Sequence, residues 1–413
     1  QPRHQAGDAA GVLGVGVGLK ELKERVIGRN RSHRLKKIGK HMSKLPEWLE
    51  DLFCRADIRI NGRRPWDLQC HDEAAYERIA GDVSLGLGES YMDGLWDCEA
   101  LDQFFDRALS AHHGKKVPPS PALLIGIAKA KLLNRQNRQR SLDVAKVHYD
   151  IGNAFYEAML DPYMQYTCAY WNGAAKDLAS AQEAKLNLIC RKLALAPGEK
   201  ILELGSGWGG FARYAAEHYG VEVIANNISA AQVEWARAKC KGLPVEFRLQ
   251  DYREATGAFD KVAAIGLCEH VGYKNYRSFF ELAHRCLKPG GIFLLHTIGR
   301  NRSVHHLDAW MDRYIFPGGM LPSAAQLGQA MDDLFVLEDW QSFGTDYDRT
   351  LMAWHANFEK SWPRFSAEYG ERFYRMWRYY LLSCAGAFRS RQIQLWQLVL
   401  SKDGIRGGWK GVR

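Results

Sequence analysis

The most constraining feature of this sequence is a regular alternation of short apolar runs with longer amphipathic runs, which begins at about residue 181. The short runs have the pattern of buried strands, and the longer runs have the spacing of helices. Strands that alternate with helices form a parallel sheet with helices on both faces. The sequence therefore predicts an α/β protein whose main domain is a doubly wound, Rossmann-like sheet. We expect strands at 200–204, 221–225, 245–249, 261–265, 291–297 and 393–400, and helices at 181–195, 211–219, 230–240 and 276–287.

The chain has 413 residues, which exceeds one ordinary domain. The dipeptide Asn61-Gly62 predicts a hairpin in the N-terminal part. A proline-rich stretch at 117–121 indicates a linker. We expect a flexible basic leader at 1–45, a small mixed α/β domain at 46–113, the linker with a basic helix at 114–140 and a catalytic domain at 141–413.

The net charge of +9 is concentrated in two segments. Residues 1–50 contain eleven Lys and Arg against five Asp and Glu, and residues 114–146 contain eight against one. Basic segments attract phosphate groups, either of nucleic acid or of anionic lipid. The helix expected over 122–140 combines apolar side chains with basic ones, which suits an interfacial membrane helix and equally an ordinary surface helix. Its basic residues include Lys129, Lys131, Arg135 and Arg138.

The sequence offers no run of roughly 18 apolar residues that could span a membrane. The apolar stretch at 9–19 is short, is followed by Lys20 and precedes no clear cleavage site, so we interpret it as part of the leader. Nine cysteines occur singly, without a Cys-x-x-Cys pair. This spacing predicts neither a zinc site nor a disulfide framework and suits a cytoplasmic protein.

A glycine-rich segment, ILELGSGWGG at 201–210, lies between an expected strand and an expected helix. Its glycines also satisfy the dinucleotide pattern G-x-G-x-x-G, so alone it is ambiguous. A dinucleotide site requires an acidic residue about 20 positions further on, where this chain has Asn226 and Asn227. Instead, Glu203 precedes the first glycine and Asp251 follows the third strand, where a carboxylate can accept from an adenine amino group. This order favours S-adenosylmethionine over a nicotinamide dinucleotide.

Further motifs make the likeness specific, and they extend from about residue 56 to 401. The chain resembles the cyclopropane-fatty-acyl-phospholipid synthases, relatives of the mycolic acid cyclopropane synthases. The mycolic acid enzymes lack the N-terminal domain, so its presence implies a phospholipid enzyme and a lipid- or membrane-associated role for residues 46–113. The matching motifs are SLGLGESYMDG at 84–94, HYD at 148–150, YMQYTCAYW at 163–171, LQDYR at 249–253, EHVG at 269–272, FLLHTIG at 293–299, YIFP at 314–317, FGTDYD at 343–348 and CAGAFR at 384–389.

The resemblance implies a set of site residues. A bicarbonate ion is implied at Cys168, Glu269, His296 and Tyr347, with Ile298 contributing its backbone, and Cys384 stands at the position of the family's active-site cysteine. The sequence departs from the family pattern at Ser206, where the family has Cys, and at 226–227, where it has an apolar residue and Thr. Cofactor contacts are expected at Tyr166, Thr167, Glu203, Gly205, Gly207, Gly209, Asn227, Ile228, Ser229, Gln232, Gln250 and Asp251.

The implied chemistry explains these residue types. An alkene is a weak nucleophile, so the methyl donor must be a strong electrophile such as a sulfonium, and attack leaves a carbocation on the acyl chain. Aromatic faces attract cations without reacting with them. Tyr314, Phe316 and Tyr347 lie in matched motifs, and Trp310 precedes one. Ring closure requires a base, which is either the held bicarbonate or a side chain such as Glu269 acting directly.

We therefore expect an enzyme that transfers a methylene group from S-adenosylmethionine to the cis double bond of an unsaturated phospholipid, with bicarbonate as a second bound group. We expect a cytoplasmic homodimer in peripheral contact with the inner face of the membrane, and no nucleic-acid partner. One alternative is a methyltransferase acting on another lipid or small molecule. A second is a membrane-binding protein with a degenerate methyltransferase domain.

Overall fold

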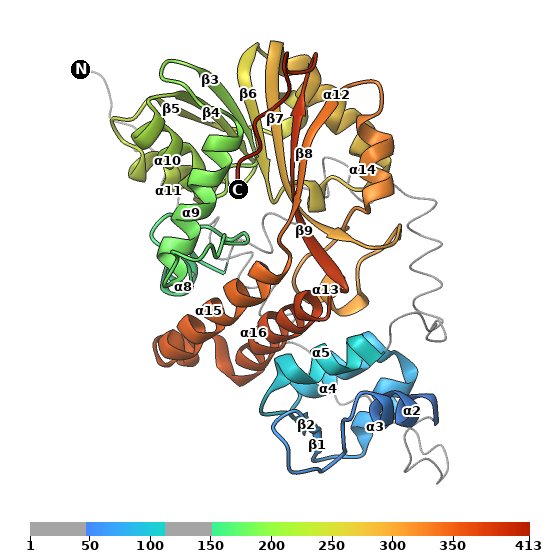
Figure 1. Ribbon diagram of the computed structural model, residues 1–413. Coiled ribbons are helices and arrows are strands. Elements are labelled where there is room, and N and C mark those ends of the chain that lie inside the picture. Colours follow the sequence, from blue (N-terminus) through green and yellow to red (C-terminus); the bar gives the residue numbers. More distant parts are fainter. Residues whose placement is uncertain (1–46, 112–150) are drawn as a thin grey trace, which may run out of the picture.

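The computed structural model describes residues 47–111 and 151–413. Its centre is a seven-stranded sheet of order β5-β4-β3-β6-β7-β9-β8 (Figure 1). The first five strands in this order run parallel, and β9 runs antiparallel to both of its neighbours. The predicted α/β fold class is confirmed. The strands are β3 (Lys200–Leu204), β4 (Glu222–Asn227), β5 (Val245–Leu249), β6 (Phe259–Ile265), β7 (Leu287–Arg300), β8 (Val336–Ser342) and β9 (Ile393–Ser401).

Apolar side chains on both faces of the sheet explain why helices cover both faces. On β3, Ile201 packs into one core, while Leu202 and Leu204 pack into the other, as the two-residue period of a strand requires. The first core includes α9 (Leu178–Lys192), α10 (Gly210–Tyr219) and α11 (Ala230–Lys239). The second includes α12 (Tyr276–Cys286) and α14 (Ala324–Met331).

The edge strand β8 was not expected from the sequence. Its residues, VLEDWQS, have no clean alternation, and Val336 and Leu337 are both exposed. The strand forms because β9 offers a free edge, and the two pair antiparallel from Val336 opposite Ser401 to Ser342 opposite Trp396.

The N-terminal unit, residues 47–111, is mainly helical. The hairpin expected at Asn61-Gly62 is wrong, because the chain before this turn forms only an isolated parallel bridge, between Ile60 and Leu68. Asn61 does turn the chain, with φ of 52°, but the loop is closed by the Asp67 carboxylate, which accepts from the N–H groups of Arg59 and Arg64 at 2.8 and 3.0 Å. The elements are α2 (Glu47–Arg55), β1 (Gln69–Cys70), α3 (Ala74–Gly81), α4 (Val83–Met92), β2 (Trp96–Asp97) and α5 (Leu101–Ala111).

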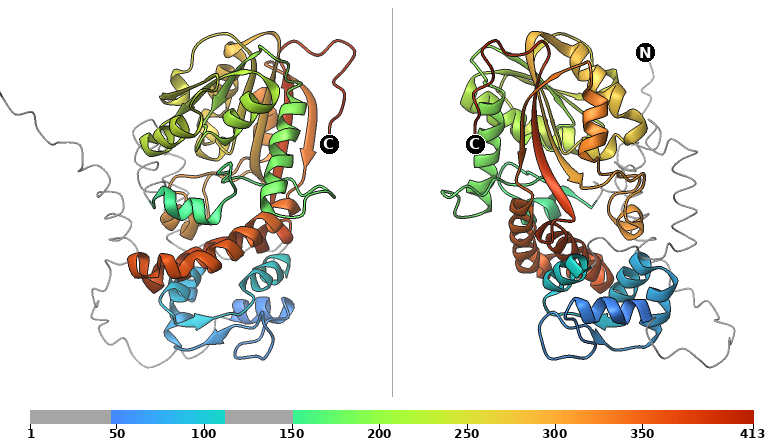
Figure 2. Two further views of the ribbon diagram at one scale, coloured as in Figure 1. Left: turned by 90° about the vertical axis from the view of Figure 1, so that its left-hand side faces the viewer. Right: turned by 45° about the vertical axis from the view of Figure 1, so that its right-hand side comes forward.

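Two long helices, α15 (Thr345–Ser361) and α16 (Ser366–Arg389), lie between the sheet and the N-terminal unit (Figures 1 and 2). Arg375 on α16 donates to the carbonyl of Trp96 at 2.9 Å, and α16 packs closely on α5 at Gly386. The N-terminal unit is therefore attached to the catalytic part through α16. The remaining elements are α8 (Asn153–Met159), α13 (Ala309–Tyr314) and short 3-10 turns at Tyr252–Glu254, Cys268–His270, Tyr273–Asn275 and Trp362–Arg364.

The leader expected at 1–45 and the basic helix expected at 122–140 lie outside the described residues. Across 47–111 and 151–413, every helix is too short or too polar to cross a membrane.

Candidate active site

The glycine loop after β3 turns the chain at the carboxyl end of the sheet. Gly205 has φ of 79°, and the N–H groups of Gly205 and Ser206 both donate to the carbonyl of Asn226 at 3.0 Å. Gly209 begins α10 with φ of 79°, and a Cβ there would lie 2.6 Å from the Phe247 ring. Gly209 therefore allows α10 to pack closely against β5.

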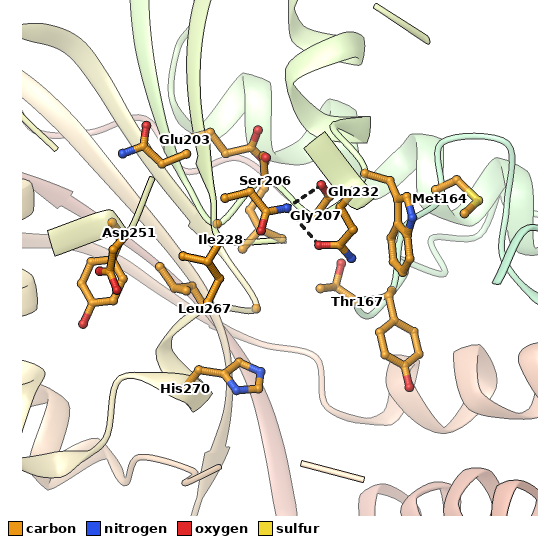
Figure 3. A pocket seen from close by; sticks show the side chains of 18 of the residues that line it. Met164, Thr167, Glu203, Ser206, Gly207, Ile228, Gln232, Asp251, Leu267 and His270 are labelled. Carbon is orange, nitrogen blue, oxygen red and sulfur yellow. Dashed lines mark hydrogen bonds between the residues drawn. The ribbon is translucent and has the colours of Figure 1, made fainter. Parts of the chain in front are cut away.

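A cavity of about 170 Å³ lies over this loop, at the carboxyl ends of β3, β4, β5 and β6. Ligands of open α/β sheets bind at this edge. Figure 3 shows Asp251 at one end of the cavity and Thr167 and Gln232 at the other, with Ile228 between them. Ten of the twelve expected cofactor contacts line it: Tyr166, Thr167, Glu203, Gly205, Gly207, Asn227, Ile228, Gln232, Gln250 and Asp251.

Gly209 and Ser229 are the two expected contacts that do not line the cavity. Each begins a helix beneath it: Gly209 precedes α10, and the Ser229 hydroxyl accepts from the Gln232 N–H at 3.4 Å at the start of α11. Both shape the loops that bound the cavity, and their contact with the cofactor stays a prediction.

Buried polar atoms around this cavity have no partner within the described part of the chain. They are the Glu203 Oε2, the Ser206 Oγ, the Gln232 Nε2 and both amide atoms of Asn226. Buried polar groups are normally hydrogen-bonded, so this cluster indicates a polar ligand. The hydroxyls, amine and carboxylate of S-adenosylmethionine supply matching donors and acceptors. Ser206 belongs to the glycine loop expected to contact the cofactor, whereas Asn226 was not among the expected contacts.

The amide of Asn227 braces the glycine loop. Its nitrogen donates to the Gly207 carbonyl at 2.8 Å and to the Gln232 Oε1 at 2.9 Å, as Figure 3 shows, and its oxygen accepts from the Ser229 N–H at 3.1 Å. Both amide protons are therefore used within the protein. Asn227, which stands where the family has Thr, therefore supports the glycine loop. Only its amide oxygen can still accept a hydrogen bond from a ligand.

The Asp251 carboxylate is fixed by its neighbour Arg253. It accepts from the Arg253 backbone N–H at 2.9 Å and from the guanidinium at 2.8 Å, and it is buried. Each oxygen keeps a second acceptor position, so the carboxylate is oriented and still able to accept from an adenine amino group.

A buried lysine that the sequence analysis missed lies beside the cofactor cavity. Lys185 on α9 is fully buried and donates to the Thr167 hydroxyl at 2.8 Å and to the side-chain carbonyl of Gln165. Burial lowers the pKa of Lys185 to about 8 and raises the pKa of Glu203 to about 8, and each charge partly offsets the shift of the other. A lysine on a helix is ordinarily exposed, so nothing in the sequence around Lys185 indicates that it is buried beside the cavity.

A second, larger cavity of about 750 Å³ adjoins the first. Its lining is mainly apolar and comes from both the N-terminal unit and the catalytic part. Tyr166, Thr167, Gly266 and His270 line both cavities, so they form the wall or opening between them. The larger cavity has the size and polarity of a site for an apolar ligand.

Glu269 lies in this cavity after β6, as the sequence predicted. Its Oε1 accepts from the Ile298 N–H at 2.6 Å, and its Oε2 has no partner within the described residues. Burial raises the pKa of Glu269 to about 7, although the Ile298 N–H favours the ionised form. Glu269 therefore changes charge near neutral pH, which suits a base or the holder of one.

His296 on β7 also lines the cavity and is oriented by β9. The Gln397 amide nitrogen lies 3.1 Å from its Nδ1, and the two residues are opposite each other in the β7–β9 register. Burial lowers the pKa of His296 well below its ordinary value, with Lys185 and Lys192 adding to the shift. The imidazole is therefore neutral. Because the amide donates to Nδ1, the proton is on Nε2, which has no partner within the described residues.

Tyr347 and Cys384 face the same cavity, whereas Cys168 lies behind its wall. Tyr347 stacks on Phe388 with ring centroids 4.5 Å apart, and its pKa is raised by burial first and then by Cys168 and Glu269. Burial raises the pKa of Cys384 to about 12, so its thiol is protonated. The Cys168 thiol donates to the Ala169 carbonyl at 3.1 Å, and burial raises its pKa well above the usual range. Neither cysteine has the character of a nucleophile.

Aromatic rings form much of the cavity wall. Trp310 and Phe316 line it as expected, and so do residues that the sequence analysis did not single out. Tyr314 does not line it, because its hydroxyl donates to Glu89 at 2.8 Å and holds α13 against α4. The additional aromatic residues of the wall are Phe53, Phe104, Phe105, Tyr379, Tyr380 and Phe388.

The strand order, the glycine loop and the polar cavity at the carboxyl edge together define a class, the S-adenosylmethionine-dependent methyltransferases. Residues 136–398 match the model of a family described as mycolic acid cyclopropane synthetase. The chain belongs to the mycolic acid cyclopropane synthetase family.

Named relatives agree. The chain is 48% identical to the cyclopropane-fatty-acyl-phospholipid synthase of Escherichia coli over 88% of this chain and 94% of that one. It is 30% identical to the tuberculostearic acid methyltransferase UfaA1 of Mycobacterium tuberculosis over 80% of this chain and 82% of that one. Among solved structures, the cyclopropane synthase MmaA2 from Mycobacterium tuberculosis matches with a TM-score of 0.60 and 29% identity, covering 63% of this chain and 98% of that one. The mycolic acid cyclopropane synthase CmaA1, complexed with SAH and CTAB, matches with a TM-score of 0.59 and 30% identity, covering 63% of this chain and 98% of that one.

Proposed function

We propose that this protein transfers a methylene group from S-adenosylmethionine to the cis double bond of an unsaturated acyl chain in a membrane phospholipid, which becomes a cyclopropane ring. The observation that carries the proposal is the contact between the polar cavity at the glycine loop and the large apolar cavity, through shared residues such as Thr167. A polar cofactor and an apolar substrate can meet only where two such spaces adjoin.

The residues around the junction suit a cationic reaction. When bound, S-adenosylmethionine supplies an electrophilic methyl group on a positively charged sulfur. The walls of the apolar cavity exclude water, which would otherwise capture a carbocation. The faces of Tyr347, Phe388 and Tyr380 offer it electrostatic stabilisation without a bond, worth about 0.5–2 kcal/mol for each well-placed ring.

Three polar groups fit a small oxyanion beside these rings. Among the described residues, the Glu269 Oε2 is an acceptor and the His296 Nε2–H a donor without a partner, and Tyr347 lines the same cavity. We assign a bicarbonate ion to this place, with Cys168 behind it, and this ion supplies the base for the last proton transfer. The Ile298 N–H already donates to Glu269, so Ile298 contributes by orienting that carboxylate. Cys384 acts as cavity wall.

The proposal includes a cytoplasmic homodimer that contacts the inner face of the membrane peripherally and has no nucleic-acid partner. The membrane contact is supported by the basic charge of residues 1–50 and 114–146, because anionic lipid attracts Lys and Arg. We assign residues 47–111 to lipid contact, since Leu49 and Phe53 from this unit line the apolar cavity.

The test is incubation of the full chain with methyl-labelled S-adenosylmethionine and vesicles of a cis-unsaturated phospholipid. The acyl chain should gain about 14 mass units, the mass of one CH₂, and the product should resist ozone, which cleaves alkenes but leaves rings intact. The same gain with ozone-sensitive product would indicate methylation without ring closure. A gain only on a water-soluble acceptor would refute the lipid assignment.

A further inference from the structure

Two arginines face the large apolar cavity and have no part in the proposed chemistry. His296, Ile298 and Arg300 alternate along β7, and all three line the cavity. Residues two apart on a strand point to the same face, so one face of β7 carries both the imidazole and the guanidinium. Four residues of strand separate them by about 13 Å.

Arg300 is a positive charge that forms no ion pair within the described residues. Within the described part of the chain its guanidinium makes no hydrogen bond or ion pair, although the residue is partly buried. Burial lowers the pKa of Arg300, and only Asp308 opposes the shift. The Oδ1 of Asp308 accepts from the N–H groups of Trp310 and Met311 at 3.1 Å at the start of α13, and this carboxylate lines the same cavity without forming an ion pair with Arg300.

The backbone holds Arg300 at a fixed place in the wall of the cavity. Its N–H donates to the Pro322 carbonyl at 2.8 Å, and it is opposite Ile393 on β9. The next residues, Asn301 and Arg302, line the same cavity and are exposed. The cavity therefore extends from Glu269 and His296 to the half-buried guanidinium of Arg300 and the exposed guanidinium of Arg302.

We propose that Arg300, assisted by Arg302, binds the phosphate diester of the phospholipid and so sets how deep the double bond enters the cavity. This inference rests on the proposed function and names the part of the substrate that the site recognises. A guanidinium pairs with two phosphate oxygens at once, which fixes position as well as charge.

The dimensions agree with this arrangement. The hydrocarbon of one leaflet is about 15 Å thick, so the middle of an acyl chain lies on the order of 8 Å from its ester group, with the phosphate a few bonds further out. That span is comparable with the strand distance from Arg300 to His296, where the reacting carbons would lie.

The experiment compares Arg300→Gln, Arg302→Gln and the unmodified full chain in nonionic micelles, which remove the charge effects of a membrane surface. The substrates are a cis-unsaturated phosphatidylglycerol and the matching diacylglycerol, which lacks the phosphate. We expect Arg300→Gln to raise the KM for the phospholipid at least tenfold and to change the KM for diacylglycerol less than twofold. Arg302→Gln should also raise the KM for the phospholipid more than the KM for diacylglycerol, but by a smaller factor than Arg300→Gln. Arg285→Gln, at an exposed position on α12, is the matched control and should change neither KM.

A binding measurement separates this inference from the proposed function. A saturated phosphatidylglycerol cannot react, and calorimetry should show that its affinity falls at least tenfold in Arg300→Gln while S-adenosylhomocysteine affinity is unchanged. Inorganic phosphate should not compete at millimolar concentration. The assignment would be overturned if Arg300→Gln lost equally on phosphatidylglycerol and diacylglycerol, or lost nothing on either lipid. Competition by inorganic phosphate as strong as that by the lipid would also overturn it. If the proposed function itself fails, neither lipid gains mass in the unmodified protein.

Discussion

The side-chain nitrogen of Gln397 lies 3.1 Å from the Nδ1 of His296, and both side chains are buried. The pair joins two antiparallel strands, β7 and β9, at directly opposite positions. Through this bond, Gln397 on β9 determines which nitrogen of the imidazole carries the proton. His296 thereby presents an N–H, not a lone pair, to the acyl cavity.

Replacing Gln397 by Glu should reverse this arrangement. A carboxylate accepts a hydrogen bond and therefore favours a proton on Nδ1. The Nε2 would then lose its proton, or the ring would carry both protons and become charged. We expect kcat to fall about tenfold to a hundredfold, the usual range for a residue that orients another. Nitrogen NMR of the His296 ring should show the proton on Nδ1. Gln394→Glu, on the same strand but bonded to Asn301 and the Arg391 carbonyl, is the control. An unchanged ring spectrum in Gln397→Glu would contradict the assignment.

Activity should depend on the ionisation of Glu269. Its pKa in the folded protein is raised to about 7 from an ordinary value of 4.5, and the proposed role requires the carboxylate. The rate should therefore be low below pH 6 and rise as the pH passes through about 7. The pH profile of kcat measures this, and a profile with an inflection near 4.5 would remove the basis for a buried Glu269 in the mechanism.

Glu269→Gln replaces the free acceptor oxygen with either a donor or a weaker acceptor. Methyl transfer can continue, but proton removal should slow, so we expect lower turnover and some methyl-branched or unsaturated product beside the ring. Mass spectrometry with bicarbonate depleted and then restored distinguishes the two candidate bases. Rescue by bicarbonate supports the held ion, whereas an unmodified enzyme indifferent to depletion would make Glu269 the direct base.

Asp251→Ala should weaken cofactor binding. The change removes a buried acceptor, a loss of roughly 1–3 kcal/mol, which corresponds to about tenfold or more in affinity. Calorimetry with S-adenosylhomocysteine measures the effect without turnover. Glu246→Ala removes a carboxylate that is exposed on β5 and pairs only locally with Arg248, so it controls for charge. Equal affinity in Asp251→Ala and the control would exclude an adenine contact at Asp251.

Cofactor binding should release a proton from Glu203. Burial raises the pKa of Glu203 to about 8, so in the empty site it is mostly protonated at pH 7. S-adenosylmethionine brings a positive sulfonium and a positive amine, which favour the ionised form. Binding heats measured in two buffers of different ionisation enthalpy should reveal proton release for S-adenosylmethionine, and less for the uncharged thioether of S-adenosylhomocysteine. Glu203→Gln should abolish the difference between buffers.

Gly386→Ala should separate the N-terminal unit from α16. A Cβ at this position would lie 2.6 Å from the Asp102 carbonyl on α5, and backbone cannot move aside as a side chain can. We expect a destabilisation of about 1–3 kcal/mol and a loss of lipid turnover, with cofactor affinity retained because residues 47–111 do not line the cofactor cavity. Gly328→Ala on α14 meets nothing within 4 Å and should not lower the thermal midpoint. A similar midpoint for both variants would contradict the close contact.

Local pattern was sufficient for the sheet and for much of the site. Strands β4, β6 and β7 each contain a continuous apolar run, β3 and β5 have apolar residues broken by single polar ones, and the carboxyl ends of parallel strands meet at one edge. Glu269 and His296 could therefore be assigned to that edge from their sequence positions alone. The family membership expected from the motifs is confirmed, and the individual roles of the site residues stay predictions.

Other features were determined only by contacts between distant segments. Strand β8 is too polar to be recognised and exists because β9 offers it an edge. Lys185 is an ordinary helical lysine in sequence, and it is buried because α9 packs against the segment that carries Thr167.

The sequence by itself thus determined the class of fold, the glycine loop and the residue types that the chemistry needs, because these follow from periodicity and motifs within short stretches. The tertiary structure alone decided which polar atoms remain unpaired. Gln397 lies 101 residues beyond His296, and the Asn227 amide is consumed by the loop that it braces. Hydrogen-bond partners depend on which chain segments become neighbours, and a neighbour across the sheet leaves no local signal in the sequence.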